Sequence, residues 1–423
     1  MARTPLFGAL QRAVRIARAS RHVPVPLDEV IDRVQAMRID AERRRFLRNA
    51  CGAVATVAIA GCNCSVPELL RPSGRDEVIV VGAGISGITA AGRLRLAVVR
   101  VRIIEANNRV GGRMLSLRGF FPDRQVIELG GELIDSNHVR IRAMAAEMGL
   151  PLDDLRGGDP LGEADVWWAD NQRYSEAEII RAFVPVAAAI ERELATLGDG
   201  DITYDAPQNA QALDAMSLSE WFERNDLGGW LRKLLDVAYT TEMGLACDQQ
   251  SALNLITFIG TRPDHFRIFG ESDERFHVRG GNDGIPRALA AKLDDAIETW
   301  TVLEALRREA GGDYVLSVRQ GAASRELRAP TVLLAIPFTM LRQVRLDVPL
   351  PAAKQRAISD LRYGTNAKLM IGFNRRVWRE QQANGSTYAD LPFQTTWETT
   401  RKQAGIGGVL VNFVGGQHGI DIA

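Results

Sequence analysis

Cysteine is scarce in this sequence, and most of it lies in one place. Only four cysteines occur among 423 residues, and Cys51, Cys62 and Cys64 fall inside or beside a single apolar stretch near the N-terminus. Cys247 therefore stands alone in the body of the chain. A disulfide framework needs pairs of cysteines, and a thiolate metal site needs a cluster of them. The composition indicates neither, and we expect no metal ion.

The chain also has no net charge, because 52 basic residues balance 52 acidic residues. We therefore expect no nucleic-acid partner, for which a basic surplus is typical. The balance is uneven along the chain: residues 1–48 hold eleven arginines and five acids, a surplus of +6, and residues 49–61 carry no charge. By subtraction from zero, residues 62–423 carry about −6.

Long apolar runs are absent from the N-terminal region as well. The stretch from Ala50 to Gly61 has 12 residues, whereas a membrane-spanning helix needs about 20. It suits the apolar part of an export signal, and residues 43–48 before it read RRRFLR, which resembles the twin-arginine pattern R-R-x-F-L-[KR]. We predict an N-terminal extension and twin-arginine-type signal over residues 1–61, with a buried cytosolic helix as the alternative.

The end of this stretch carries a second signal. Residues 59–62 read IAGC and resemble a lipobox, which makes Cys62 a candidate for a lipid anchor. Together the two signals predict a periplasmic or membrane-anchored extracytoplasmic location. Met37 is an alternative start of the protein. Residues 62–76 contain two prolines and a glycine and read as a linker.

A dinucleotide-binding pattern follows the linker. Glu77–Val81 is a short β-branched run, typical of a strand buried on both faces. Residues 82–87 read GAGISG, in which the glycines allow a tight turn, a close approach to a pyrophosphate and a closely packed helix. Val99–Ile104 is a second apolar run, and Glu105 at its end is placed to accept a hydrogen bond from a ribose 2′-OH. This pattern favours a dinucleotide site over a merely structural βαβ unit.

Two further segments narrow the choice of dinucleotide. Residues 109–116 read RVGGRMLS and resemble the R-x-G-G-R-x-x-[ST] motif of FAD-dependent amine oxidases, and residues 130–138, GGELIDSNH, are similar to the D-L-G-G-x-W-I segment of the same enzymes. Residues 77–416 thus resemble the flavin monoamine oxidase / L-amino-acid oxidase family. The resemblance implies non-covalent FAD bound by Gly82, Gly84, Ile85, Ser86, Gly87, Glu105, Ala106, Gly111, Gly112, Arg113, Gly130, Gly131, Glu132 and Val302.

A single lysine interrupts an apolar strand near the C-terminus. Residues 366–373 read NAKLMIGF, with Lys368 among apolar neighbours. Burying an ammonium group costs several kcal/mol unless it is paired or its pKa falls, and the alternative is a lysine at a strand edge that reaches solvent. The segment is similar to the amine-oxidase stretch whose lysine holds a water against flavin N5, which makes Lys368 the candidate catalytic residue.

Two acids in the second glycine segment are candidates for substrate contact. The resemblance places Glu132 and Asp135 at the substrate chamber, where an acid would attract a cationic amine; a solvated turn is the alternative. Snake-venom-type L-amino-acid oxidases have an arginine near this point that clamps the substrate carboxylate, and Leu133 stands in its place. Arg140 falls on the predicted following helix, so we expect no clamp of that kind.

The resemblance implies an α/β fold, with a split FAD-binding Rossmann-like domain and a substrate domain of mixed sheet and helices. We assign residues 77–138 and 278–340 to the FAD-binding domain, 139–277 to a helical substrate domain, and 341–423 to strands of the substrate domain. Val98 departs from the family, which has a glycine between the first helix and the second strand. It predicts a strained turn or another closure.

The resemblance also implies a C-terminal segment that re-enters the FAD domain with a glycine-rich F-A-G-E-x-T-type motif. Val409–Val414 reads as a strand, and no such motif follows before Ala423. We therefore expect a truncated or frameshifted reading frame, or a second chain that supplies the segment. The attachment cysteine of covalently flavinylated members would lie in the same segment.

For the function, the resemblance implies C–N bond oxidation of a primary amine or L-amino acid to an imine. Hydrolysis then gives an aldehyde or keto acid and ammonia, while O2 is reduced to H2O2. The alternatives are an FAD-dependent desaturase or protoporphyrinogen-oxidase-like oxidoreductase, and an inactive truncated oxidase fragment. The sequence leaves open which amine is used and the oligomeric state, a homodimer included.

Overall fold

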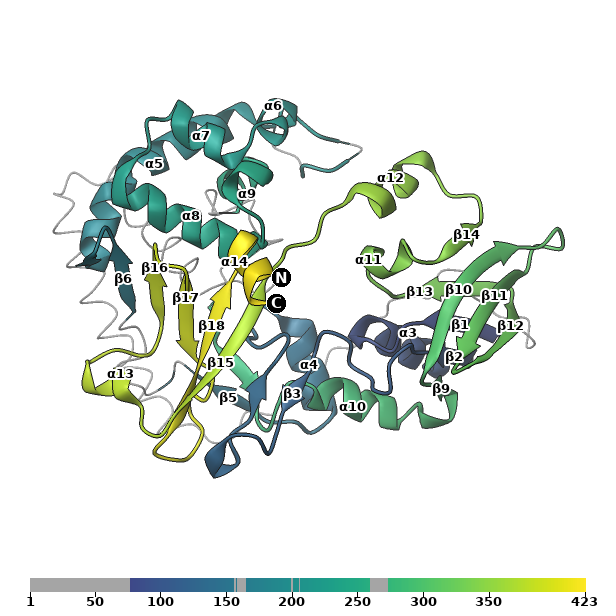
Figure 1. Ribbon diagram of the computed structural model, residues 1–423. Helices are drawn as coiled ribbons and strands as arrows, with labels where there is room; N and C mark the ends of the chain where they lie inside the picture. The colour runs from purple at the N-terminus through teal and green to yellow at the C-terminus, as the bar shows by residue number, and fades with distance from the viewer. Residues whose placement is uncertain (1–76, 156, 158–164, 199–200, 205, 259–272) are drawn as a thin grey trace, which may run out of the picture.

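The computed structural model describes residues 77–155, 157, 165–198, 201–204, 206–258 and 273–423 (Figure 1). The predicted extension, export signal, lipidation site and linker, residues 1–76, lie outside the described residues. Among the residues described, no helix is long and apolar enough to cross a membrane.

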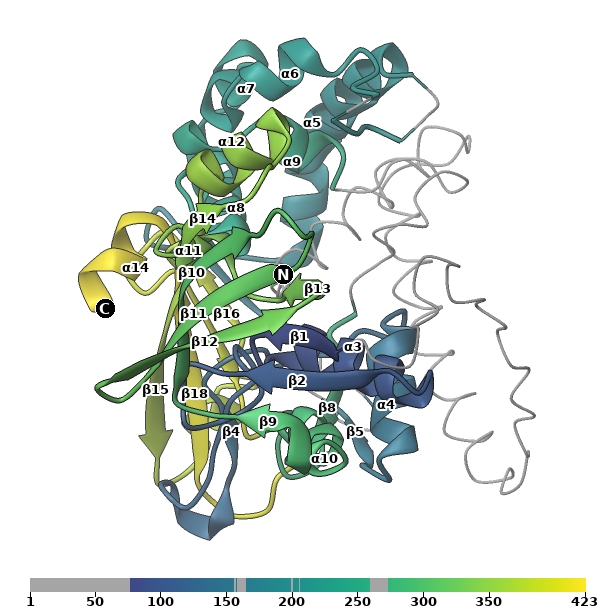
Figure 2. The ribbon, with the colours of Figure 1, turned by 90° about the vertical axis from the view of Figure 1, so that its right-hand side faces the viewer.

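A four-stranded parallel sheet carries the glycine-rich turn. Its strand order is β13 (Thr331–Leu334), β1 (Glu77–Val81), β2 (Arg100–Ile104) and β9 (Ile297–Glu298). Val78 and Val80 on one face pack on α3 (Ile85–Leu96) and α10 (Gly284–Ala291). Ile79 and Val81 on the other face pack on a second sheet (Figure 2). β1 is therefore buried on both faces, as its β-branched sequence predicts.

The second sheet is built on a long hairpin. Its order is β12 (Ala323–Ala329), β11 (Tyr314–Gln320), β10 (Thr301–Arg308) and β14 (Arg345–Asp347). Two short helices, α11 (Phe338–Leu341) and α12 (Ala352–Asp360), flank β14 in sequence. Residues 331–337 read TVLLAIP, an apolar run that indicates a buried strand, but β13 lies at the edge of the parallel sheet and Leu333 is 38% exposed.

A six-stranded sheet forms the floor under the helices of the substrate region (Figure 1). Its order is β15 (Ala367–Phe373), β18 (Gly408–Val414), β17 (Thr395–Glu398), β16 (Thr387–Ala389), β6 (Val166–Ala169) and β7 (Gln172–Tyr174). Residues 139–277, predicted as mainly helical, thus also supply strands β6 and β7. Trp167 and Trp168 lie in β6, and Trp167 is buried in the core.

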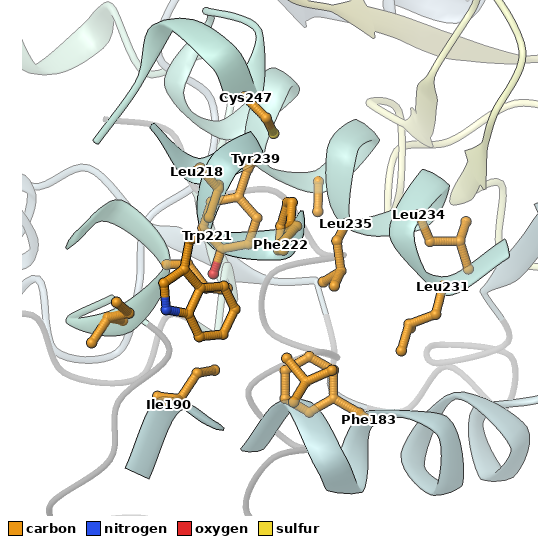
Figure 3. Close-up of a cluster of buried hydrophobic side chains, with 14 of the residues drawn as sticks. Phe183, Ile190, Leu218, Trp221, Phe222, Leu231, Leu234, Leu235, Tyr239 and Cys247 are labelled. Atoms are coloured by element: carbon orange, nitrogen blue, oxygen red, sulfur yellow. The ribbon is translucent and has the colours of Figure 1, made fainter. Parts of the chain in front are cut away.

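The helices above this sheet are α5 (Glu176–Thr196), α6 (Gln211–Ala215), α7 (Leu218–Arg224), α8 (Gly229–Met243) and α9 (Leu253–Ile256). Their common core contains Phe183, Trp221 and Tyr239, which point toward one another in Figure 3. α7 begins at a capping box, in which Ser217 and Glu220 each bond the other's backbone N–H. Of the two serines whose sequence position suits a cap here, Ser217 and Ser219, the structure uses Ser217.

Short elements connect these parts. β3 (Ser116–Leu117) pairs with β4 (Ile127–Glu128), and β5 (Leu152–Asp154) pairs with β8 (Phe276–Val278). The others are α4 (Val139–Glu147), α13 (Val377–Glu380), α14 (Gly416–Ile422), and the 3-10 turns η2 (Pro122–Arg124), η3 (Cys247–Gln249) and η4 (Asp294–Ala296).

Val98 closes the turn between α3 and β2 in a left-handed conformation. Its φ is +62°, and its side chain is 89% exposed. A β-branched residue with this φ is strained. Of the two closures expected from the sequence, the structure shows the strained turn.

Candidate functional site

The glycine-rich turn lies at the carboxyl end of β1, directly before α3. Gly82 has a φ of +103°, which L side chains rarely adopt. A Cβ on Gly87 would overlap the Gly82 carbonyl oxygen, so only glycine lets the helix pack this closely. Gly84 is the N-cap of α3 and gives it no side-chain cap. The N–H groups of Ile85 and Ser86 therefore open a helix whose positive dipole end suits a diphosphate.

A second glycine pair lies against this turn. The Gly111 N–H donates to the Ala83 carbonyl over 2.9 Å. A Cβ built on Gly84 would meet only the Cα of Gly112, 4.0 Å away, so the space beside Gly84 is open. Arg113 follows with an exposed side chain. This open cradle, rimmed by backbone N–H groups, fits the pyrophosphate of FAD.

Glu105 ends β2 next to the cradle and is 8% exposed. Its Oε2 accepts from the Ala83 N–H at 2.7 Å, and its Oε1 accepts from the Asn107 N–H at 2.8 Å. The carboxylate therefore holds the glycine turn and the segment after β2 together. Ala106, between Glu105 and Asn107 in this segment, is exposed. Each oxygen has further lone-pair capacity, and the contact of Glu105 with a ribose stays a prediction.

The start of β10 is fixed beside the same acid. The Thr301 N–H donates to the Glu105 carbonyl over 2.8 Å. Val302, predicted to contact FAD, follows directly and is half-buried. Glu105 and Val302, both predicted to bind FAD, are thus brought together by the backbone hydrogen bond between Thr301 and Glu105.

The glycine pair at 130–131 extends this surface toward the six-stranded sheet. The Gly131 N–H donates to the Arg113 carbonyl over 3.0 Å, and a Cβ on Gly130 would overlap the same oxygen. Nothing lies within 4 Å of a Cβ on Gly131. The two predicted glycine segments are therefore direct neighbours.

Lys368 reaches this second segment from β15. Its Nζ lies 2.8 Å from Oε2 of Glu132, 2.9 Å from the Gly130 carbonyl oxygen and 3.2 Å from the Glu128 carbonyl oxygen. An ammonium group has three donors, and these acceptors satisfy all three. β15 is an edge strand, but the lysine side chain is only 13% exposed. The alternative that it reaches solvent is therefore wrong, and its catalytic role stays a prediction.

Glu132 is the anionic partner of this lysine and is 4% exposed. Burial alone would raise the pKa of its carboxyl, but the charge of Lys368 and hydrogen bonds from Lys368, Trp397 and Thr399 outweigh burial and lower that pKa below its ordinary value. The Trp397 indole N–H donates to Oε1 over 2.9 Å. Glu132 is thus a buried anion bonded by two strands of the sheet.

Asp135 serves the fold of its own loop. Its Oδ1 accepts from the Glu274 N–H at 2.7 Å, and its Oδ2 lies 3.3 Å from Nε2 of His138. Both acids predicted to attract a substrate amine are therefore engaged within the protein. Their contact with substrate stays a prediction that this geometry does not favour.

A polar network that was not predicted lies beside the pair. Glu128 is fully buried, and its carboxylate accepts from the Ser116 hydroxyl at 2.8 Å and the Asn282 N–H at 2.8 Å and lies 2.9 Å from Nε2 of His277. The one sequence signal was an acid inside the apolar run before Gly130. Within the described ranges, no group of three or more His, Cys, Asp or Glu side chains is placed to hold a metal ion.

Comparisons with known proteins agree with this geometry. The sequence model of the family described as "Flavin containing amine oxidoreductase" matches residues 85–423. An L-amino acid dehydrogenase from Synechocystis sp. is 25% identical over 385 residues, covering 84% of this chain and 76% of that protein.

Solved structures show the same fold. Cyclohexylamine oxidase from Brevibacterium oxydans superposes with a TM-score of 0.69 at 21% identity, covering 82% of this chain and 77% of that one. Putrescine oxidase bound to putrescine superposes with a TM-score of 0.67 at 20% identity, with the same shares covered. Because the family model matches residues 85–423, the chain belongs to the flavin-containing amine oxidoreductase family.

Proposed function

We propose that this protein is an FAD-dependent oxidase of primary amines or L-amino acids. In this reaction the C–H bond beside the nitrogen is broken, the bound flavin supplies the two-electron acceptor, O2 is reduced to H2O2, and water converts the imine to an aldehyde or keto acid and ammonia. The contribution of the protein is to orient the reactants and to keep bulk water from them.

The observation that carries the proposal is the position of the Lys368 ammonium. It lies buried against Gly130, one residue from the open surface of Gly131, where the two glycine segments meet. In the flavin amine oxidases that the sequence resembles, the lysine at the position matching Lys368 holds a water at the flavin. The Glu128 carbonyl is the farthest of its three acceptors, at 3.2 Å. A water in place of that carbonyl would leave the bonds to Gly130 and Glu132 intact.

We further propose that FAD is bound without a covalent link. The cradle of Gly84 and Gly112 offers backbone and charge contacts to the pyrophosphate, which need no covalent bond. Among the described residues the free cysteine is Cys247, which belongs to the helical core. Burial there raises the pKa of its thiol well above the ordinary value and makes it a poor nucleophile.

The substrate class depends on whether the loop after Gly131 offers an arginine to a substrate carboxylate. Leu133 is half-buried where an arginine clamp is expected in L-amino-acid oxidases. Arg142 is only partly engaged: it donates to the Ser136 carbonyl and lies 4.7 Å over the ring of Phe276, while its buried Nε has no hydrogen-bond partner among the described residues. The absence of an arginine at position 133 is what favours primary amines over amino acids.

The test uses the full chain loaded with FAD and mixed without oxygen with primary amines, L-amino acids and large apolar porphyrinogen or polyene substrates. The proposal predicts loss of the flavin absorbance band with an amine or amino acid, and its recovery with release of H2O2 when O2 is admitted. Bleaching only by the large apolar substrates would favour the desaturase-like alternative. A chain that retains no FAD would favour the inactive alternative.

For the location, we propose export by the twin-arginine-type signal with anchoring at Cys62. The support is the pattern of residues 43–62 alone. Fractionation of cells that express the full chain tests it: replacement of Arg43 and Arg44 by lysine should retain the protein in the cytoplasm. Replacement of Cys62 by serine should release it from the membrane fraction, and unchanged fractionation in both variants would contradict the proposal.

A further inference from the structure

Glu132 connects two strands of the six-stranded sheet. Its Oε2 accepts from Lys368 on β15 at 2.8 Å, and its Oε1 accepts from Trp397 on β17 at 2.9 Å. The indole ring also lies 5.5 Å from Nζ of the lysine, within the range of a cation–π contact. With the lysine side chain 13% and the glutamate side chain 4% exposed, either charge alone would be costly at this point.

The two other acids near the pair have partners of their own. Glu128 offers its carbonyl oxygen to Lys368, while its carboxylate is bonded to Ser116, Asn282 and His277. The nearest acid along the loop, Asp135, is bonded to the Glu274 N–H. The carboxylate that balances Lys368 is therefore that of Glu132.

We propose that Glu132 is a positioning residue, which fixes Lys368 as an ammonium ion at the Gly130–Gly131 segment so that the two side chains present no net charge to the flavin. The inference rests on the proposed function, which puts the flavin ring beside this segment. It replaces the expectation that Glu132 attracts the substrate amine. Lys368 then acts as a fixed hydrogen-bond donor. The Glu132 carboxylate holds it in place and is itself held by the indole N–H of Trp397.

The reduction potential of the bound flavin tests the charge balance. It is measured for the wild type, E132Q, K368M and the double variant. E132Q leaves an unbalanced positive charge that favours the added electrons, so the potential should rise. K368M leaves an unbalanced negative charge, so the potential should fall. The double variant is neutral again and should return close to the wild-type potential.

A second buried glutamate in the same sheet supplies the control. Glu398 is bonded by Arg376 at 2.6 Å and by the Trp378 indole at 2.9 Å, and its side chain is 1% exposed. It has the same kinds of partners as Glu132, but they are Arg376, Trp378 and Arg379 rather than residues bonded to the glycine segments. E398Q should lower the unfolding temperature without moving the flavin potential.

The outcomes separate this inference from the proposed function. If K368M leaves the potential unchanged, Lys368 is not beside the flavin, and the proposed function loses its support. If K368M lowers the potential but E132Q does not raise it, the inference is overturned and the proposed function stands. If E132Q does not fold, K368M and the double variant decide: removal of Glu132 must raise the potential of K368M, and equal potentials would overturn the inference.

Unfolding of the same variants without FAD gives a second readout. E132Q and K368M should each lower the unfolding midpoint, because each leaves one buried charge without its partner. The double variant should lose less than the sum of the two, and additive losses would contradict the pairing.

Discussion

Replacing Gly84 and Gly87 by alanine separates cofactor binding from folding, because the two glycines meet different surroundings. At Gly84 the backbone has φ −69° and ψ 172°, which alanine adopts freely, and the added methyl would meet only the Gly112 Cα, 4.0 Å away. At Gly87 the methyl would overlap the Gly82 carbonyl oxygen. We therefore expect G84A to fold like the wild type and G87A to lose about 3 kcal/mol of unfolding free energy through overpacking.

Although G84A should fold normally, we expect it to bind FAD more weakly, because its methyl group fills the space assigned to the pyrophosphate. We expect its Kd for FAD to rise at least tenfold, which corresponds to about 1.4 kcal/mol of binding free energy. Isothermal titration with FAD and urea unfolding measure the two quantities. Gly92 is the matched control, since it lies within α3 with nothing within 4 Å of a Cβ.

The control variant G92A should change stability in the opposite direction from G87A. G92A is expected to gain about 1 kcal/mol of stability from helix propensity and to bind FAD like the wild type. Wild-type FAD affinity in G84A would refute the assignment of the cradle. A stable G87A would refute the reasoning about the close approach of α3 to the glycine turn.

Three further predictions concern single side chains. V98G should gain about 1 kcal/mol in urea unfolding, because the residue adopts a φ of +62° with little packing to lose; a lower urea midpoint would contradict the assigned strain. S217A should lose about 1 kcal/mol by removing the cap bonded to the Glu220 N–H, and unchanged thermal unfolding would show that the cap is dispensable. The pKa of Glu132 is lowered, despite burial, by Lys368 and the hydrogen bonds. Its ionised form therefore contributes stability above its ordinary pKa, and this contribution is lost as the pH falls through the lower folded value. The stability difference between wild type and E132Q should shrink on acidification, and a constant difference would argue against the ion pair.

Local patterns predicted the first part of the fold correctly. The run Glu77–Val81, the glycine turn and the periodic helix after it are adjacent in sequence, and adjacent residues fix one another's backbone geometry. The strain at Val98 was likewise predictable from the sequence, because a β-branched residue occupies the position where the chain must turn. The capping box of α7 is equally local, because Ser217 and Glu220 are only three residues apart.

Contacts between distant residues were not predictable in the same way. The sequence indicated that a buried Lys368 needs a partner and made Glu132 a candidate to attract a substrate amine, but 236 residues separate the two, and no local pattern pairs them. Trp397 is 265 residues from Glu132 and carries no motif. β6 was missed because its pairing with β16, some 220 residues away, outweighs the helical character of its neighbours.

The central claim is that this chain holds FAD beside Lys368 and uses it to oxidise a C–N bond. The most direct test is the rate at which a primary amine bleaches the bound flavin without oxygen, measured in the wild type and in K368M. We expect bleaching in the wild type, recovery with release of H2O2 on addition of O2, and a K368M variant that retains FAD but is reduced at least tenfold more slowly. Equal rates in the two proteins, or an FAD-loaded wild type that no amine or amino acid reduces, would contradict it.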